Sequence, residues 1–118
     1  MAAMNVRIVT RRIGIDDRDR EYIRRCIANA LNRRLDRVAE AVIALEDLNG
    51  PRGGKDQRCG VTLLLSPRGS VRAQAESSDL WSAVDRAVQK AARQLDRLLE
   101  SSWSSRRRLY RRHQFSAA

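Results

Sequence analysis

Residues 38–76 read VAEAVIALEDLNGPRGGKDQRCGVTLLLSPRGSVRAQAE and contain three apolar runs separated by turn-forming residues. The first run, residues 38–47, is rich in Val, Ile, Ala and Leu, and the Asn, Gly and Pro residues of 49–54 follow it. A second run covers residues 58–65 and ends at the turn sequence SPRG. Beyond that turn, residues 71–75 alternate between apolar and polar types. The stretch therefore predicts a meander of three strands.

The residues before this meander predict one strand and one helix. Residues 4–9 alternate between apolar and polar types, which is the period of a half-buried strand. We expect a helix over residues 17–36, because Asp16 and Asp17 are both suitable N-caps and the apolar residues after them recur at helical spacing. Those apolar residues are Ile23, Cys26, Ile27, Ala30, Leu31 and Leu35.

A second helix is expected after the meander, with Ser78 or Asp79 as its N-cap and its end near Glu100. Its apolar stripe consists of Leu80, Trp81, Val84, Val88, Ala91, Leu95 and Leu99. The element order is then βαβββα. The simplest way to bury both helical stripes is an α+β fold in which two parallel helices pack on one face of a four-stranded, mostly antiparallel sheet.

Length and charge restrict the domain organisation and the partner. A chain of 118 residues is the usual size of one domain, and its net charge of +10 favours a polyanionic partner, either nucleic acid or an anionic membrane surface. Residues 101–118 contain five arginines and no acid. We therefore expect a folded domain at residues 1–100 and a flexible basic tail at residues 101–118.

Other sequence features give no indication of catalysis, and we expect no enzyme, metal or cofactor. Cys26 and Cys59 lack metal-ligand spacing and are expected to be buried thiols, while His113 has no second ligand nearby in sequence. The glycine-rich residues 50–54 lack the Lys-Ser/Thr ending of a phosphate-binding loop. Neither a membrane-spanning run nor a signal peptide is apparent, which predicts a cytoplasmic protein.

The second helix also carries four cations on the side opposite its apolar stripe, within roughly 60° of one another around the helix axis. These are Arg86, Lys90, Arg93 and Arg97. Like-charged neighbours destabilise a helix by roughly 0.2–0.5 kcal/mol per pair, so the pattern favours anion binding over a merely solvated face. The first helix adds a polar outer face, and RNA phosphates would suit both. No aromatic stacking pair is expected on either outer face. The predicted RNA-binding residues are Arg25, Asn29, Arg33, Arg86, Lys90, Arg93 and Arg97.

Two segments of the second helix resemble a known family. DLWSAVD at residues 79–85 and KAARQL at residues 90–95 are similar to the second-helix signature of the hibernation-promoting and ribosome-associated translation inhibitor family, also called sigma-54 modulation proteins. Ile15, Arg20, the EYI of residues 21–23 and the NGPRGG loop support the resemblance, which covers residues 4 to about 100.

The resemblance implies binding to ribosomal RNA of the small subunit, in the channel between head and body, where tRNA and mRNA positions would be blocked and idle ribosomes silenced. Lys90 and Arg93 match basic positions of the family directly, and Arg97 lies close to another. Asn29 and Asn32 stand where family members usually have lysines. The chain resembles the short members, which lack the C-terminal dimerisation domain.

Two alternatives remain open from the sequence. A double-stranded-RNA-binding module has a similar αβββα order and a basic motif like QKAAR at residues 89–93, although that motif belongs at a helix N-terminus and the strand at residues 4–9 would be extra. A regulatory protein could instead use the basic face to bind an acidic protein partner. Salt-sensitive RNA binding would disfavour this second alternative.

Overall fold

The computed structural model describes residues 4–48 and 56–116. The elements are β1 (Asn5–Arg11), α1 (Asp17–Leu31), a 3₁₀ helix η1 (Asn32–Arg37), β2 (Val38–Asp47), β3 (Gln57–Leu65), β4 (Ser70–Ser77) and α2 (Leu80–Ser116). This is the predicted βαβββα order with one short helix added. The glycine-rich loop expected at residues 49–54 lies outside the described residues.

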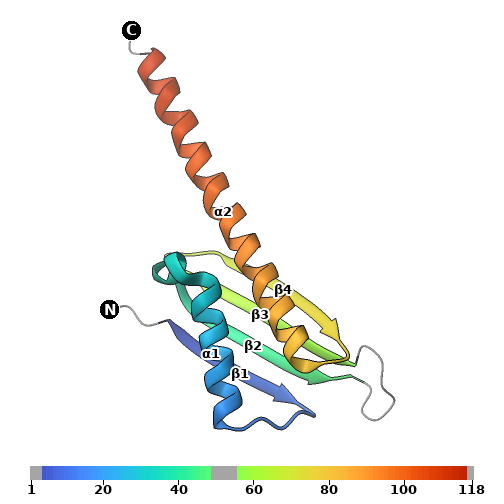
Figure 1. Ribbon diagram of the computed structural model, residues 1–118. Coiled ribbons are helices and arrows are strands. Elements are labelled where there is room, and N and C mark those ends of the chain that lie inside the picture. The colour runs from blue at the N-terminus through green and yellow to red at the C-terminus, as the bar shows by residue number, and fades with distance from the viewer. Residues whose placement is uncertain (1–3, 49–55, 117–118) are drawn as a thin grey trace.

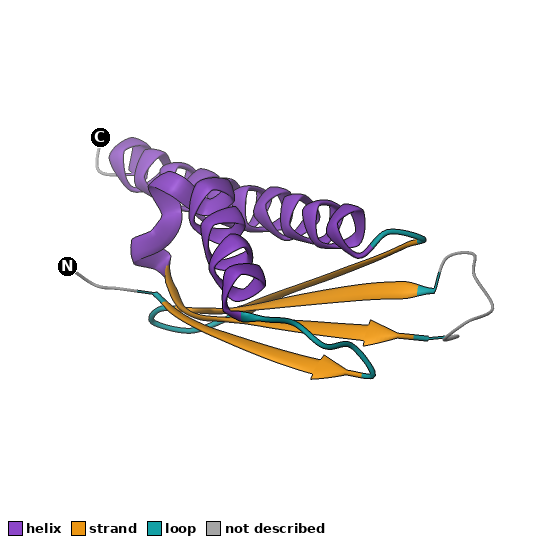
Figure 2. Ribbon diagram, turned by 60° about the horizontal axis from the view of Figure 1, so that its bottom comes forward, coloured by secondary structure: helices purple, strands orange, loops and turns teal. Residues whose placement is uncertain are grey.

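The four strands form one sheet in the order β1-β2-β3-β4 (Figure 1). β1 pairs parallel with β2, and the other two pairings are antiparallel. Both α-helices run in the same general direction over one face of this sheet, and no helix of residues 4–48 and 56–116 covers the opposite face (Figure 2). The predicted α+β fold is confirmed.

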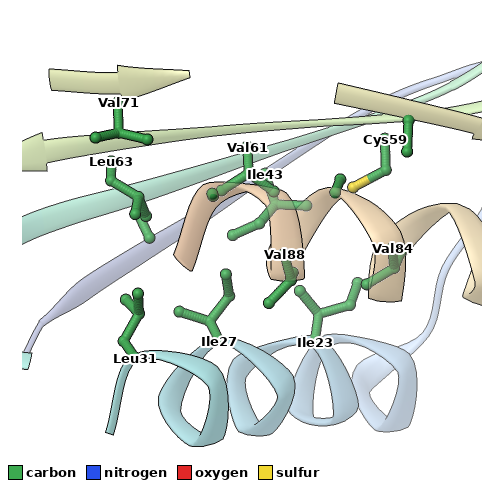
Figure 3. Packing of buried hydrophobic residues seen from close by; sticks show 14 of the residues in the cluster. Ile23, Ile27, Leu31, Ile43, Cys59, Val61, Leu63, Val71, Val84 and Val88 are labelled. Atoms are coloured by element: carbon green, nitrogen blue, oxygen red, sulfur yellow. The ribbon is translucent and has the colours of Figure 1, made fainter. Parts of the chain in front are cut away.

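The core lies between the helices and the sheet (Figure 3). Alternate strand residues such as Ile43 and Val61 are almost fully buried, because successive side chains of a strand point to opposite faces. Facing them are Ile23, Ile27 and Leu31 from α1 and Val84, Val88 and Leu95 from α2. Aliphatic side chains fill this layer, as the low aromatic content of 4% requires.

Helix α1 begins where predicted but ends earlier. The Asp16 carboxylate accepts from the backbone N–H of Asp19 at 2.9 Å, and the Asp19 carboxylate accepts from the N–H of Asp16 at 3.1 Å, which forms a capping box. The α-helix ends at Leu31, because Asn32 adopts a φ of 37°, a region that asparagine tolerates better than most residues. The prediction of a helix to residue 36 was therefore wrong. Leu35 still packs against the core, but from η1.

Helix α2 begins after Asp79, whose carboxylate accepts from the backbone N–H of Ser82 at 3.0 Å. It continues to Ser116, so the expected end near Glu100 was wrong. Residues 80–116 contain neither glycine nor proline that would stop the helix. No helix in the described part of the chain has an apolar stretch long enough to span a bilayer. The flexibility of residues 101–118 stays a prediction.

Candidate nucleic-acid interface

The cationic stripe of α2, defined as Arg86, Lys90, Arg93 and Arg97, lies on the side of the helix that faces away from the core. All four residues are exposed, as predicted. The opposite side of the helix is anchored by Ala87, Ala91 and Leu95, each at most 1% exposed. Burial of that side fixes the rotation of α2 and therefore holds the stripe toward solvent.

Lys90 also contacts the sheet. Its Nζ donates to the backbone carbonyl oxygen of Gln74 at 3.2 Å. Gln74 belongs to β4, which is an edge strand, so its outward carbonyl has no neighbouring strand to pair with. An ammonium group has three donors, and two of them remain for an anion.

The arginines of the stripe have no acidic partner among the described residues, whereas Arg11 and Arg58 of the sheet form ion pairs. On the uncovered sheet face, Arg58 lies 2.9 Å from Glu76 and Arg11 lies 4.0 Å from Glu46, measured between nitrogen and carboxylate oxygen. Among the described residues, no acidic side chain pairs with Arg86, Arg93 or Arg97. Three charges of the stripe are therefore not neutralised locally.

Helix α1 contributes less positive charge than the sequence suggested. Arg25 is exposed, but its Nε lies 3.5 Å from the Glu21 carboxylate. Exposed pairs of this kind are weak, so a phosphate can displace the glutamate. Asn29 is exposed on the same helix, whereas Asn32 and Arg33, predicted on the outer face of α1, belong to η1 because the α-helix ends at Leu31.

Acidic residues interrupt the basic surface where the two helices meet. Asp96 of α2 forms an ion pair with Arg34 of η1. Asp85 of α2 approaches α1, with its Oδ1 3.8 Å from the sulfur of Cys26. The two predicted basic faces are therefore separated by a region with little net positive charge, here called the inter-helix seam. The seam consists of Tyr22, Cys26, Arg34, Trp81, Asp85 and Asp96.

An aromatic pair lies in this seam and was missed by the sequence analysis. The ring centroids of Tyr22 from α1 and Trp81 from α2 are 5.0 Å apart, with an angle of 78° between the ring planes. Edge-to-face geometry of this kind is favourable for aromatic rings. A hydrogen bond with Cys26 and the nearby charge of Asp85 raise the pKa of Tyr22. Trp81 was assigned only to the apolar stripe, and no pattern within either helix predicted the pairing.

The two thiols differ in exposure. Cys59 is fully buried, and burial raises the pKa of its thiol to about 12. Cys26 is half-buried, and the pKa of its thiol is also raised, mainly by burial. The prediction of buried thiols is therefore confirmed for Cys59 but not for Cys26. In the described residues no three His, Cys, Asp or Glu side chains cluster in a way that could hold a metal ion.

Comparisons with known proteins agree with this architecture. Residues 6–102 match the family model of the sigma 54 modulation protein / S30EA ribosomal protein. The chain is similar in structure to the N-terminal domain of Protein Y from Thermus thermophilus, with a TM-score of 0.67 and 28% identity over 80% of this chain and 99% of that one.

A ribosomal subunit interface protein from Coxiella burnetii has a TM-score of 0.63 and 20% identity, over 82% of this chain and 99% of that one, and it shows the shared fold. No curated protein matches the chain.

The family match covers most of the chain and confirms the resemblance that the second-helix segments suggested. The family consists of ribosome-associated hibernation and modulation factors, and it is not known as a family of enzymes. On this match, the chain belongs to the sigma 54 modulation protein / S30EA ribosomal protein family.

Proposed function

We propose that this protein acts in the cytoplasm by binding ribosomal RNA of the small ribosomal subunit, in the channel that tRNA and mRNA occupy, and thereby inhibits translation by idle ribosomes. The observation that best supports this proposal is the exposed cationic stripe of α2, in which Arg86, Arg93 and Arg97 have no acidic partner among the described residues. Membership of a family of ribosome-associated factors makes ribosomal RNA the natural polyanion.

Helix geometry makes the stripe suitable for an RNA backbone. With a rise of about 1.5 Å per residue, the distance from Arg86 to Arg97 along the helix is about 16 Å. The arginines can donate two hydrogen bonds to one phosphate, and Lys90 can act as a point charge beside them. Each phosphate neutralised releases condensed counterions, which makes binding favourable at low salt.

Helix α1 and η1 extend the proposed contact beyond α2. Arg25, Asn29 and Arg33 are all exposed on these two elements. Arginine and asparagine can reach phosphate oxygens or the 2′-hydroxyl groups of RNA. In this proposal the protein inhibits by occupying space and needs no chemical step.

Sedimentation with purified small subunits and with vacant ribosomes, at low and at high salt, tests the proposal. We expect co-migration at low salt that is lost at high salt. Preloading the subunits with mRNA and tRNA should prevent it, whereas an unrelated ribosome-binding factor that binds outside the channel should not. Absence of co-migration at low salt would contradict ribosome binding, and co-migration unaffected by tRNA and mRNA would contradict the channel.

Duplex RNA added as a competitor separates this proposal from a general double-stranded-RNA-binding module. A channel-binding factor should remain with the small subunit when free duplex is present at the same concentration of phosphates. Complete release by the duplex would favour the module. Co-migration that does not respond to salt would favour recognition of a ribosomal protein.

A further inference from the structure

The inter-helix seam contains side chains that a purely phosphate-binding surface would not use. Tyr22 is 45% exposed although it is a large aromatic residue. Trp81, its edge-to-face partner at 5.0 Å, packs against the hydrophobic core. The partly buried tryptophan therefore supports the tyrosine ring from the side of the core, while Tyr22 stays exposed and available for contact.

A carboxylate lies close to this ring. Cys26 follows Tyr22 by one turn of α1, and its sulfur lies 3.8 Å from Oδ1 of Asp85. The charge of Asp85 also contributes to the raised pKa of Tyr22, as expected for a carboxylate that contacts the residue one turn away from the tyrosine. Asp85 is exposed and has no basic partner among the described residues. Oδ1 of Asp85 accepts from the Cys26 thiol, and a carboxylate has acceptor sites left on its second oxygen. Such an exposed carboxylate repels phosphate, but it accepts hydrogen bonds from a neutral donor such as an amino group.

Exposed cations are present next to this pair. Arg25 is three residues after Tyr22 on α1, and Arg86 directly follows Asp85 on α2. An RNA strand could therefore place phosphates at the arginines while one base enters the seam. Stacking of bases on aromatic side chains is the general way in which proteins bind unpaired RNA bases.

We propose that Tyr22 and Asp85 form a subsite for one unpaired RNA base that carries an exocyclic amino group. The base stacks on the Tyr22 ring, and its amino group donates to the Asp85 carboxylate. Cytosine, adenine and guanine have such an amino group and uracil has none, so the subsite disfavours uracil. This inference rests on the proposed function and deepens it by naming the part of the RNA that the seam would bind.

Fluorescence of Trp81 provides the test. The chain has two tryptophans, at positions 81 and 103, so Trp103→Phe leaves Trp81 as the single reporter. Hexamers of cytidine and of uridine are added at low salt, and both the quenching and the apparent affinity are measured. We expect the cytidine hexamer to quench Trp81 and to bind more tightly than the uridine hexamer. Equal quenching and equal affinity for the two hexamers would overturn the inference.

Three substitutions separate the two contacts. Tyr22→Leu should lower the affinity for the cytidine hexamer by about five- to 150-fold, the range that loss of one base–aromatic stack produces. Tyr22→Phe keeps the ring and should retain the affinity. Asp85→Asn should reduce the preference for cytidine over uridine, although removal of a negative charge raises the affinity for both hexamers. Equal affinities of the Leu and Phe variants would rule out stacking on Tyr22.

A control and a second readout keep the outcomes distinct. Leu98→Ala removes another side chain that is 45% exposed and should leave hexamer binding unchanged. Salt-dependent co-migration with small subunits, together with identical responses to the two hexamers, would leave the proposed function standing and refute the subsite. Discrimination between the hexamers without any ribosome binding would refute the proposed function and leave the subsite as a site for single-stranded RNA.

Discussion

Replacement of both Arg93 and Arg97 by glutamate should weaken binding to the small ribosomal subunit more than an equal change of charge elsewhere on the domain. Both side chains are exposed on α2 and neither pairs with an acid among the described residues. Reversal therefore breaks no ion pair of the folded protein. Any loss of binding then reflects contacts with the RNA.

The expected magnitude follows from counterion release. Each phosphate contact contributes about 0.7–0.9 to the slope of log affinity against log salt, so loss of two contacts should reduce that slope by about 1.4–1.8. At a salt concentration of about 0.1 M, the same two contacts correspond to an affinity loss of about 25- to 60-fold. Repulsion between the new glutamates and the phosphates increases this loss further.

Affinity is measured by titration of labelled protein into small subunits at four or more salt concentrations. The matched control is the Arg68→Glu and Arg72→Glu double variant, which lowers the net charge by the same amount. Arg68 and Arg72 are exposed, but they lie in the turn before β4 and on β4. Thermal unfolding of both variants checks that the fold is intact, since surface changes of this kind usually alter stability by less than about 0.5 kcal/mol.

The reasoning is refuted if the control variant loses binding while the α2 variant retains it, because the RNA-binding face would then be the sheet side of the domain. Equal losses for the two variants would mean that overall charge, rather than the stripe, governs the affinity.

Three further outcomes follow from the structure. Asp79→Ala removes the cap that accepts from the N–H of Ser82 and should lower the free energy of unfolding by about 1 kcal/mol, measured in urea; no loss would mean that the cap is unimportant for α2. The Cys59 thiol, with its pKa raised from 9.0 to about 12, should resist alkylation at pH 8 until the protein unfolds, whereas half-buried Cys26 should react sooner. In the unfolded chain the Cys59 thiol loses its proton at a lower pH than in the folded protein. The free energy of unfolding should therefore fall as pH rises from 9 toward 12. Truncation after Glu100 should leave the thermal midpoint nearly unchanged, because the described core lies within residues 4–99, and should weaken ribosome binding modestly; an unfolded product would show that residues 101–118 are required for folding.

Most of the fold could be predicted because its elements have strong local signals. β2 was predicted with the bounds that the structure has, since a run of Val, Ile, Ala and Leu ending before turn formers leaves little choice. The N-caps of both α-helices were also predicted from their aspartates. The end of α1 was missed because Leu35 keeps the helical period, while the positive φ of Asn32 has no sequence signal beyond the tolerance of asparagine.

The candidate site was predicted only in part, for a physical reason. Exposure of the α2 stripe follows from the helical period alone, so one helix was enough to predict it. The pairing of Tyr22 with Trp81 and the contact of Cys26 with Asp85 depend on how α1 lies beside α2. Packing between elements decides such contacts, and residues 59 positions apart give no local pattern.

The hydrogen bond from Lys90 to the carbonyl of Gln74 also affects how this protein behaves at high concentration. An edge strand with unpaired carbonyls can recruit a strand of another molecule and start aggregation, and a lysine over the edge opposes this. Lys90 thus opposes pairing of the β4 edge with a strand of another molecule, in addition to its proposed role in RNA binding. Lys90→Ala should therefore lower solubility as well as RNA affinity, and light scattering in the absence of RNA would separate the two effects.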